Sequence, residues 1–162
     1  MARSAACQAA FEDLDADLAG RRLIVRVDRI ELSKNLLRGF AAYDDLLDRY
    51  PEWREQVVFG AFVYPSREGL EPYVAYRHQV AGMVTDINHR WGTPGWTPVL
   101  YDDSDDFPCS VAGLRRYDAL LVNPIRDGLN LVAKEGPLVN DRDGVLVLSS
   151  EAGAHEELGG WP

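Results

Sequence analysis

The chain has 162 residues, a formal net charge of -9 and an isoelectric point of about 4.7. This length suits one domain with a sizeable core, and the 46% hydrophobic and 27% charged residues are typical of a soluble globular protein. The acidic balance argues against a general nucleic-acid binder, no apolar run is long enough to span a membrane, and two isolated cysteines exclude a disulfide framework. We therefore expect a reduced, cytoplasmic protein with a single domain over residues 1–162.

Hydrophobic periodicity predicts strands and helices that alternate along the chain. Helical spacing predicts helices in the second half of 1–20, over 34–50, over 71–91, around 111–117, over 131–139 and from about 152. Continuous apolar runs predict strands at 23–27, 57–63, 99–101, 119–122 and 145–148. Ser33 is a plausible N-cap for the second helix. The alternation predicts an α/β fold, a Rossmann-like parallel sheet flanked by helices.

Three loops follow predicted strands, over residues 28–33, 64–69 and 123–130. The carboxyl ends of parallel strands lie at one edge of the sheet, and ligands bind there. We therefore expect these three loops to lie close together and to form the binding site.

The first of these loops lies in a cationic window. From Arg21 to Arg38 there are six cations and two acids, so this window has a net charge of +4 in a chain of -9. The cations are Arg21, Arg22, Arg26, Arg29, Lys34 and Arg38. Arg and Lys suit phosphate oxygens, so an anionic ligand is one explanation. A solvated basic face that pairs with acids elsewhere explains the charges about equally well.

The stretch from Ala119 to Glu135 indicates a strand, a Gly-containing loop and the start of a helix. Free amides at a helix start bind anions, and the carboxylates of Asp127 and Glu135 suit hydroxyls. A phosphate flanked by hydroxyls suggests a nucleotide-sugar. Local chemistry alone favours the simpler alternative, a turn aspartate and an acid that complements the helix dipole. Arg67 likewise suits a second phosphate or is solvated, and the acidic loop Asp102–Asp106 indicates a solvated loop rather than a metal site.

Four stretches match motifs of a known family. Pro65-Ser66-Arg67 is similar to a Pro-Ser-Arg loop, and Gly95-Trp96-Thr97-Pro98 is similar to a Trp-Thr-Pro turn. Arg26-Val27-Asp28 with Ser33-Lys34 resembles an Arg-x-Asp-x-x-Lys phosphate motif with extra residues before the lysine. Residues 126–135, RDGLNLVAKE, resemble Arg-Asp-Gly-Met-Asn-Leu-Val-Ala-Lys-Glu. Over about residues 21–159 the chain therefore resembles the C-terminal, donor-binding half of trehalose-6-phosphate synthases, retaining GT-B glycosyltransferases of family 20.

The resemblance implies a role for each matched residue. Arg26 and Lys34 would neutralise the donor diphosphate, Asp127 would bind donor-sugar hydroxyls, and these three would form the catalytic set. Glu135 would hold the ribose, Arg67 the acceptor phosphate, and Phe107 would line the base pocket. The implied nucleotide-sugar contacts are Arg26, Lys34, Phe107, Asp127, Leu129, Asn130, Leu131, Val132, Ala133, Lys134 and Glu135. The implied reaction is retaining transfer of glucose from UDP-glucose or GDP-glucose to glucose 6-phosphate, with no metal or cofactor.

Departures from the family pattern define what else we expect. Asn35 and Leu129 stand where the common motifs have Gly and Met, which indicates a divergent branch that also includes validoxylamine-phosphate synthase-like pseudo-glycosyltransferases. The 162 residues have no counterpart of the family's N-terminal acceptor domain and end before the helices that finish the fold. We expect a domain truncated at its C-terminal end, inactive without its partner domain, with apolar patches that favour self-association. A non-catalytic nucleotide-sugar-binding module is the alternative.

Overall fold

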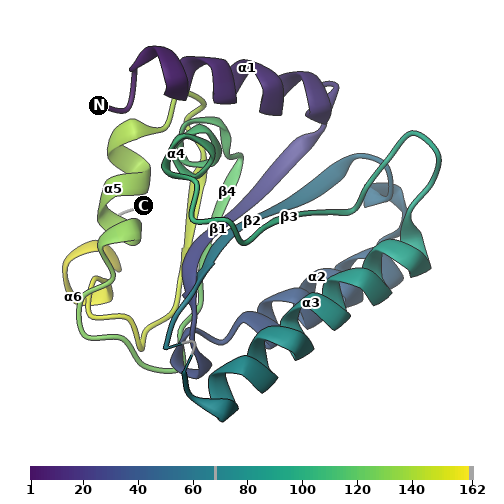
Figure 1. The fold of residues 1–162 in the computed structure, drawn as a ribbon. Helices are drawn as coiled ribbons and strands as arrows, with labels where there is room; N and C mark the ends of the chain where they lie inside the picture. Colours follow the sequence, from purple (N-terminus) through teal and green to yellow (C-terminus); the bar gives the residue numbers. More distant parts are fainter. Residues whose placement is uncertain (68, 161–162) are drawn as a thin grey trace.

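The computed structural model describes residues 1–67 and 69–160 and shows one β-sheet between two layers of helices (Figure 1). In chain order the elements are α1 (Ala5–Leu18), β1 (Arg22–Ile30), η1 (Leu32–Lys34), α2 (Leu36–Arg49), η2 (Pro51–Trp53), β2 (Val57–Pro65), α3 (Glu71–Trp91), β3 (Val99–Asp102), α4 (Phe107–Arg116), β4 (Ala119–Val122), α5 (Leu131–Val139), β5 (Val145–Leu148) and α6 (His155–Leu158). The two η elements are short 3₁₀-helices. Residue 68 of the predicted loop 64–69 and residues 161–162 at the chain end lie outside the described residues.

The five strands are parallel and lie in the order β3-β2-β1-β4-β5, which confirms the predicted α/β sheet. Helices α2 and α3 cover one face, and α1, α4 and α5 cover the other (Figure 1). The chain builds outward from β1 to β3, then returns to β4 on the other side of β1. Doubly wound sheets bind ligands at the carboxyl ends of the strands flanking this reversal. In residues 1–67 and 69–160 no helix is long and apolar enough to cross a membrane.

Strand β1 is longer than its apolar run predicts. Residues 28–30 continue the strand, because they pair in register with residues 63–65 of β2. The first half of the predicted loop 28–33 is therefore wrong, and so are residues 64–65 of the predicted loop 64–69, which end β2. The predicted helix start is also wrong, since Ser33 lies in η1 and α2 begins at Leu36. Asn35, in the left-handed conformation with φ of 62°, occupies the N-cap position.

Aromatic side chains bind α2 to the sheet. The Phe59 ring of β2 lies 5.2 Å from the Phe40 ring and 5.3 Å from the Tyr43 ring of α2, measured between centroids. The Tyr43 hydroxyl donates to the carbonyls of Val57 and Pro98, both at 3.0 Å. Aromatic burial of this kind contributes much of the energy of a small core. These contacts fix α2 against the sheet near the amino ends of β2 and β3.

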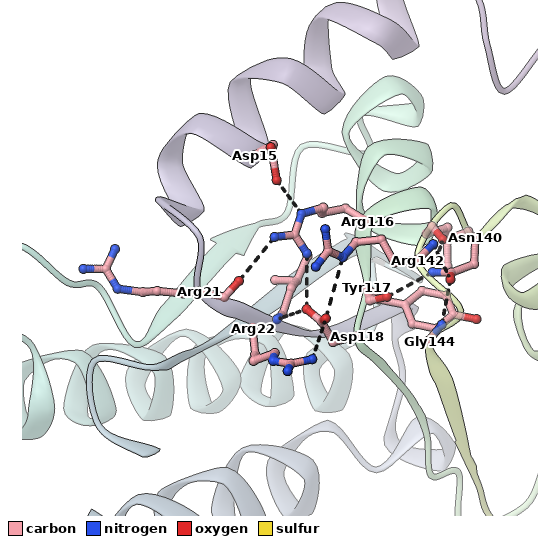
Figure 2. Close-up of polar contacts among 11 residues, drawn as sticks. Asp15, Arg21, Arg22, Arg116, Tyr117, Asp118, Asn140, Arg142 and Gly144 are labelled. Carbon is pink, nitrogen blue, oxygen red and sulfur yellow. Dashed lines mark hydrogen bonds and ion pairs between the residues drawn. The ribbon is translucent and has the colours of Figure 1, made fainter. Parts of the chain in front are cut away.

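The amino ends of the strands are held by a polar cluster around Asp118, shown in Figure 2. The Asp118 carboxylate accepts from the Leu23 amide at 2.9 Å and from the buried Arg116 guanidinium at 3.2 Å. Arg116 also bonds Asp15 of α1 at 2.5 Å. The cluster also contains Arg22, which lies 3.3 Å from Asp118. Two cations of the predicted cationic window, Arg21 and Arg22, therefore lie at the edge of the sheet opposite the predicted site.

Candidate functional site

An open cavity of about 300 Å³ lies at the carboxyl edge of the sheet, where the chain reverses between β1 and β4. Its walls come from β1, the end of η1, β2, the loop after β4 and the first turn of α5. The lining residues are Val27, Asp28, Arg29, Lys34, Tyr64, Asp127, Leu129, Asn130, Leu131 and Val132. The cavity lies where parallel sheets bind ligands, and it brings two cations next to a helix start.

The described parts of the three predicted loops meet around this cavity, as the sequence predicts. The Ser66 hydroxyl donates to the Glu31 carboxylate at 2.8 Å, which joins the loop after β2 to the end of β1. The Ile125 amide donates to the Ser33 carbonyl at 2.8 Å, which joins the loop after β4 to η1. Residues far apart in sequence therefore form one continuous edge.

The ammonium group of Lys34 lies between two carboxylates. Its Nζ is 2.5 Å from Asp127 Oδ2 and 3.4 Å from Asp28 Oδ1. Burial opposes the charged form of Lys34, but the hydrogen bond and charge of Asp127 and the charge of Asp28 outweigh it and raise the pKa of Lys34. Burial also opposes ionised Asp127, yet its hydrogen bond with Lys34 lowers the Asp127 pKa below the usual value. Both groups are therefore charged at neutral pH.

The loop that carries Asp127 ends in a helix cap. Asn130 adopts the left-handed conformation with φ of 58°, and its Oδ1 accepts from the Ala133 amide at 3.1 Å. Its Nδ2 donates to Asp127 Oδ2 at 3.0 Å. The amides of Leu131 and Val132 at the start of α5 have no intrahelical partner, as in any α-helix, and these residues line the cavity. One asparagine thus starts the helix and orients the carboxylate.

The segment after β5 holds this loop through backbone hydrogen bonds. The Asp127 amide donates to the Glu151 carbonyl at 3.1 Å, and the Gly153 amide donates to the Asp127 carbonyl at 2.8 Å. A Cβ at Gly153 would lie 1.9 Å from the Gly128 carbonyl oxygen, so only glycine fits this close approach. No local pattern in the sequence predicts a role for Gly153. Its position five residues after the apolar strand that ends at Leu148 was the available signal.

Arg26, a predicted diphosphate ligand, does not line the cavity. Its side chain is completely buried, and β1 continues past it to Ile30. Its guanidinium donates to Asp28 Oδ2 at 3.1 Å, to Asn123 Oδ1 at 2.6 Å and to the Lys34 carbonyl. Burial lowers the Arg26 pKa although Asp28 raises it. With its donors directed at protein acceptors, Arg26 supports the site rather than contacting a ligand in the cavity.

The cation beside Lys34 in the cavity is Arg29, for which the sequence predicts no individual role. Its side chain is 49% exposed and lies 3.1 Å from Glu31. Residues 29–34, RIELSK, have the spacing of Arg-x-Asp-x-x-Lys with Glu31 in place of Asp, so no insertion is needed. This spacing was the signal that could have identified Arg29. The cations of the window are thus dispersed. Some lie at each of the two sheet edges, Arg26 lies in the core, and Arg38 is exposed on α2.

The remaining predicted residues lie outside the cavity lining. Glu135 is exposed on α5, one helical turn beyond Leu131, and its side chain has no hydrogen-bond or ion-pair partner among residues 1–67 and 69–160. Ala133 is buried, and Lys134 pairs with Glu157 at 2.5 Å. Phe107 begins α4 and is 56% exposed. Arg67 donates to the Tyr73 hydroxyl at 3.1 Å.

A second cavity, of about 480 Å³ between α1, α4 and β3, has different chemistry. Its walls are apolar, with a rim of carboxylates from Asp13, Asp17, Asp102 and Asp106. The nearby carboxylates add to burial in raising the Cys109 pKa to about 11. Such a rim repels a phosphate. Of these two cavities, only the one with Lys34 and Arg29 suits an anionic ligand.

Comparison with known proteins gives consistent matches. The family model described as glycosyltransferase family 20 matches residues 1–161. The chain is 39% identical over 148 residues to a trehalose-6-phosphate synthase of Cronobacter sakazakii, covering 90% of this chain and 31% of that protein. It superposes with a TM-score of 0.87 and 36% identity on a UDP-forming α,α-trehalose-phosphate synthase from Burkholderia xenovorans in complex with glucose-6-phosphate, covering 94% of this chain and 35% of that one.

A structure described as trehalose-6-phosphate from E. coli bound with UDP-2-fluoro glucose also superposes with a TM-score of 0.87, at 37% identity, covering 93% of this chain and 34% of that one. The chain therefore spans about a third of the length of the relatives it matches. The matched structures share the parallel sheet flanked by helices.

Proposed function

Because the chain belongs to glycosyltransferase family 20, we propose that it is the donor-binding domain of an α,α-trehalose-phosphate synthase. Its fold is the Rossmann-like C-terminal domain of a GT-B glycosyltransferase. The observation that carries the proposal is the pairing of Lys34 with Asp127 in a cavity at the start of α5. This arrangement presents a cation, free amides and a carboxylate to one ligand.

The cationic side of the cavity suits the diphosphate of a nucleotide-sugar. Lys34 supplies a point charge and Arg29 a planar set of donors to phosphate oxygens. The amides of Leu131 and Val132 add the positive end of the α5 dipole. When the bond from the sugar C1 to the diphosphate breaks, negative charge grows on the leaving oxygen. These groups stabilise that charge without reorganising, because the fold already holds them in place.

The carboxylates suit the hydroxyl groups of the same ligand. Asp127 would accept from the donor sugar, and Glu135, one turn along α5, from the ribose. When the Lys34 ammonium binds the diphosphate instead of Asp127, the Asp127 carboxylate is free to accept hydrogen bonds from the sugar hydroxyls. The backbone of Leu129 to Lys134 would follow the ligand toward its base, with Phe107 at the base pocket. In this proposal Arg29 replaces Arg26 as the diphosphate contact.

The acceptor is proposed to be glucose 6-phosphate, which a matched structure contains. Arg67 contacts Tyr73 twice, through a hydrogen bond to the hydroxyl and through a cation–π contact with the ring. Because exposed contacts of this kind are weak, Arg67 would leave Tyr73 and bind the acceptor phosphate. The matched relatives are described as trehalose-6-phosphate synthases, which favours a glucose donor over a cyclitol. The names UDP-forming and UDP-2-fluoro glucose in the matched structures favour UDP-glucose over GDP-glucose.

We further propose that residues 1–162 act as one domain with an N-terminal acceptor domain as partner. GT-B transfer takes place in the cleft between two such domains, and the relatives are about three times as long as this chain. The chain alone should therefore bind the donor without turnover. Exposed apolar side chains such as Leu131 and Leu138 are available for a partner domain or for self-association, which light scattering would distinguish.

Fusion to an acceptor domain tests the proposed reaction. Joining the N-terminal domain of the Cronobacter sakazakii relative ahead of this chain should produce UDP release from UDP-glucose that depends on glucose 6-phosphate. The chain alone, and the fusion carrying Asp127→Ala, should release none. If the fusion binds UDP-glucose and still releases no UDP with this acceptor, the proposed reaction is wrong. If the chain alone is active, the proposed need for a second domain is wrong.

A further inference from the structure

Arg26 and Asp28 form a buried ion pair on β1 that contributes no proposed contact to either substrate. Arg26 is 0% exposed and Asp28 is 6% exposed. Arg26 Nε lies 3.1 Å from Asp28 Oδ2. Desolvating such a pair costs about as much as its attraction returns, and apolar residues of similar volume usually pack as well. The pair is therefore poorly explained by stability alone.

The three donor groups of Arg26 reach three parts of the site. Besides Asp28, they contact the Asn123 amide oxygen in the loop after β4 and the carbonyl of Lys34 at the end of η1. The α2 helix leaves room for this guanidinium through Gly39, where a Cβ would lie 2.6 Å from Arg26 Nη1. One buried cation thus links β1, η1 and the loop that leads to Asp127.

Asp28 completes the arrangement from the other side. One carboxylate oxygen holds Arg26, and the other lies 3.4 Å from the Lys34 ammonium. Lys34 is therefore held twice, at its carbonyl by Arg26 and at its ammonium by Asp28. Asp127, at 2.5 Å, is the closer partner of the ammonium. When a donor sugar occupies Asp127, Asp28 is the carboxylate that keeps Lys34 at the cavity wall.

We propose that Arg26 and Asp28 are positioning residues that direct Lys34 into the cavity, Arg26 through the Lys34 carbonyl and Asp28 through its ammonium. The inference rests on the proposed role of Lys34 as a diphosphate ligand. In this proposal Arg26 does not contact the ligand and acts on it only through Lys34. Loss of either residue should allow Lys34 to settle on Asp127 or to leave the cavity, and should weaken diphosphate binding.

Lysine-selective ¹³C/¹⁵N labelling tests this directly, because the chain has only two lysines, Lys34 and Lys134. In Asp28→Asn the side-chain signals of Lys34 should shift, while those of Lys134, paired with Glu157 on α6, stay in place as an internal reference. The affinity for UDP, measured by calorimetry on the whole chain, should fall about tenfold. Unchanged Lys34 signals, or UDP affinity within about twofold of wild type, would overturn the proposal.

Asp28→Asn leaves the Arg26 guanidinium buried without a carboxylate, which can unfold the chain. The double variant Arg26→Gln/Asp28→Asn removes both charges and is the second test, with the same expected loss of UDP affinity and the same shift of the Lys34 signals. Asp45→Asn, at the exposed pair with Arg49 on α2, is the matched control and should change neither. Wild type that binds no UDP would refute the proposed function, while the lysine spectra would still decide whether Asp28 positions Lys34.

Discussion

Replacing Lys34 with alanine should weaken the binding of UDP-glucose by about 10- to 100-fold, the loss expected for one charge-assisted hydrogen bond. The reason is the position of its ammonium, which lies 2.5 Å from Asp127 in the cavity where the diphosphate is proposed to bind. Glu135→Ala should also weaken binding, through the ribose. Calorimetric titration of each variant measures both effects.

The matched control removes a cation far from the cavity. Arg49→Ala deletes an exposed charge that pairs with Asp45 on α2, and it should bind UDP-glucose like wild type. Circular dichroism on each variant separates lost binding from lost folding. Wild-type affinity in both Lys34→Ala and Glu135→Ala would show that the site is assigned to the wrong residues.

Gly153→Ala should abolish measurable donor binding and lower the free energy of unfolding by roughly 1–3 kcal/mol, as overpacking does. The new methyl group would lie 1.9 Å from the Gly128 carbonyl oxygen and 2.6 Å from its carbon, so the backbone must move. That movement breaks the hydrogen bonds that join Asp127 to residues 151 and 153. Urea denaturation and calorimetry measure the two effects on the same sample.

The same substitution at an open position provides the comparison. Gly82 lies within α3, and a Cβ there meets nothing within 4 Å. Gly82→Ala should therefore increase stability by about 0.5–1 kcal/mol, because alanine favours the helix, and should leave donor binding unchanged. Donor binding by Gly153→Ala at wild-type affinity would contradict the support that we assign to this segment.

Most of the fold is predictable because the strands are continuous apolar runs between helical patterns. The run at Val57 marks a buried parallel strand, and the run at Val145 marks an edge strand on which Val145 and Val147 are exposed. The alternation of such runs with helices determines the layers. The end of β1 was not predictable in the same way. Residues 28–30 include two charged side chains, and only pairing with β2 shows that they belong to the strand.

The site was predicted unevenly, for a physical reason. Asp127 and the start of α5 follow from a long local motif, and the structure places them on the cavity. Arg26 and Arg29 lie on one strand, and charge alone does not show which guanidinium faces solvent, although the spacing from Arg29 to Lys34 matches the motif. Burial of Arg26 depends on partners distant in sequence, above all Asn123, and on the space that Gly39 leaves.

Titration of wild-type chain with UDP-glucose and GDP-glucose by isothermal calorimetry tests the central claim most directly. Our account predicts saturable binding of one nucleotide-sugar per chain for at least one of the two donors, with UDP-glucose favoured. Inorganic phosphate serves as the control and should bind more weakly, since it lacks the hydroxyl groups for Asp127 and Glu135. Absence of binding for both nucleotide-sugars, by a chain shown to be folded, would contradict the account.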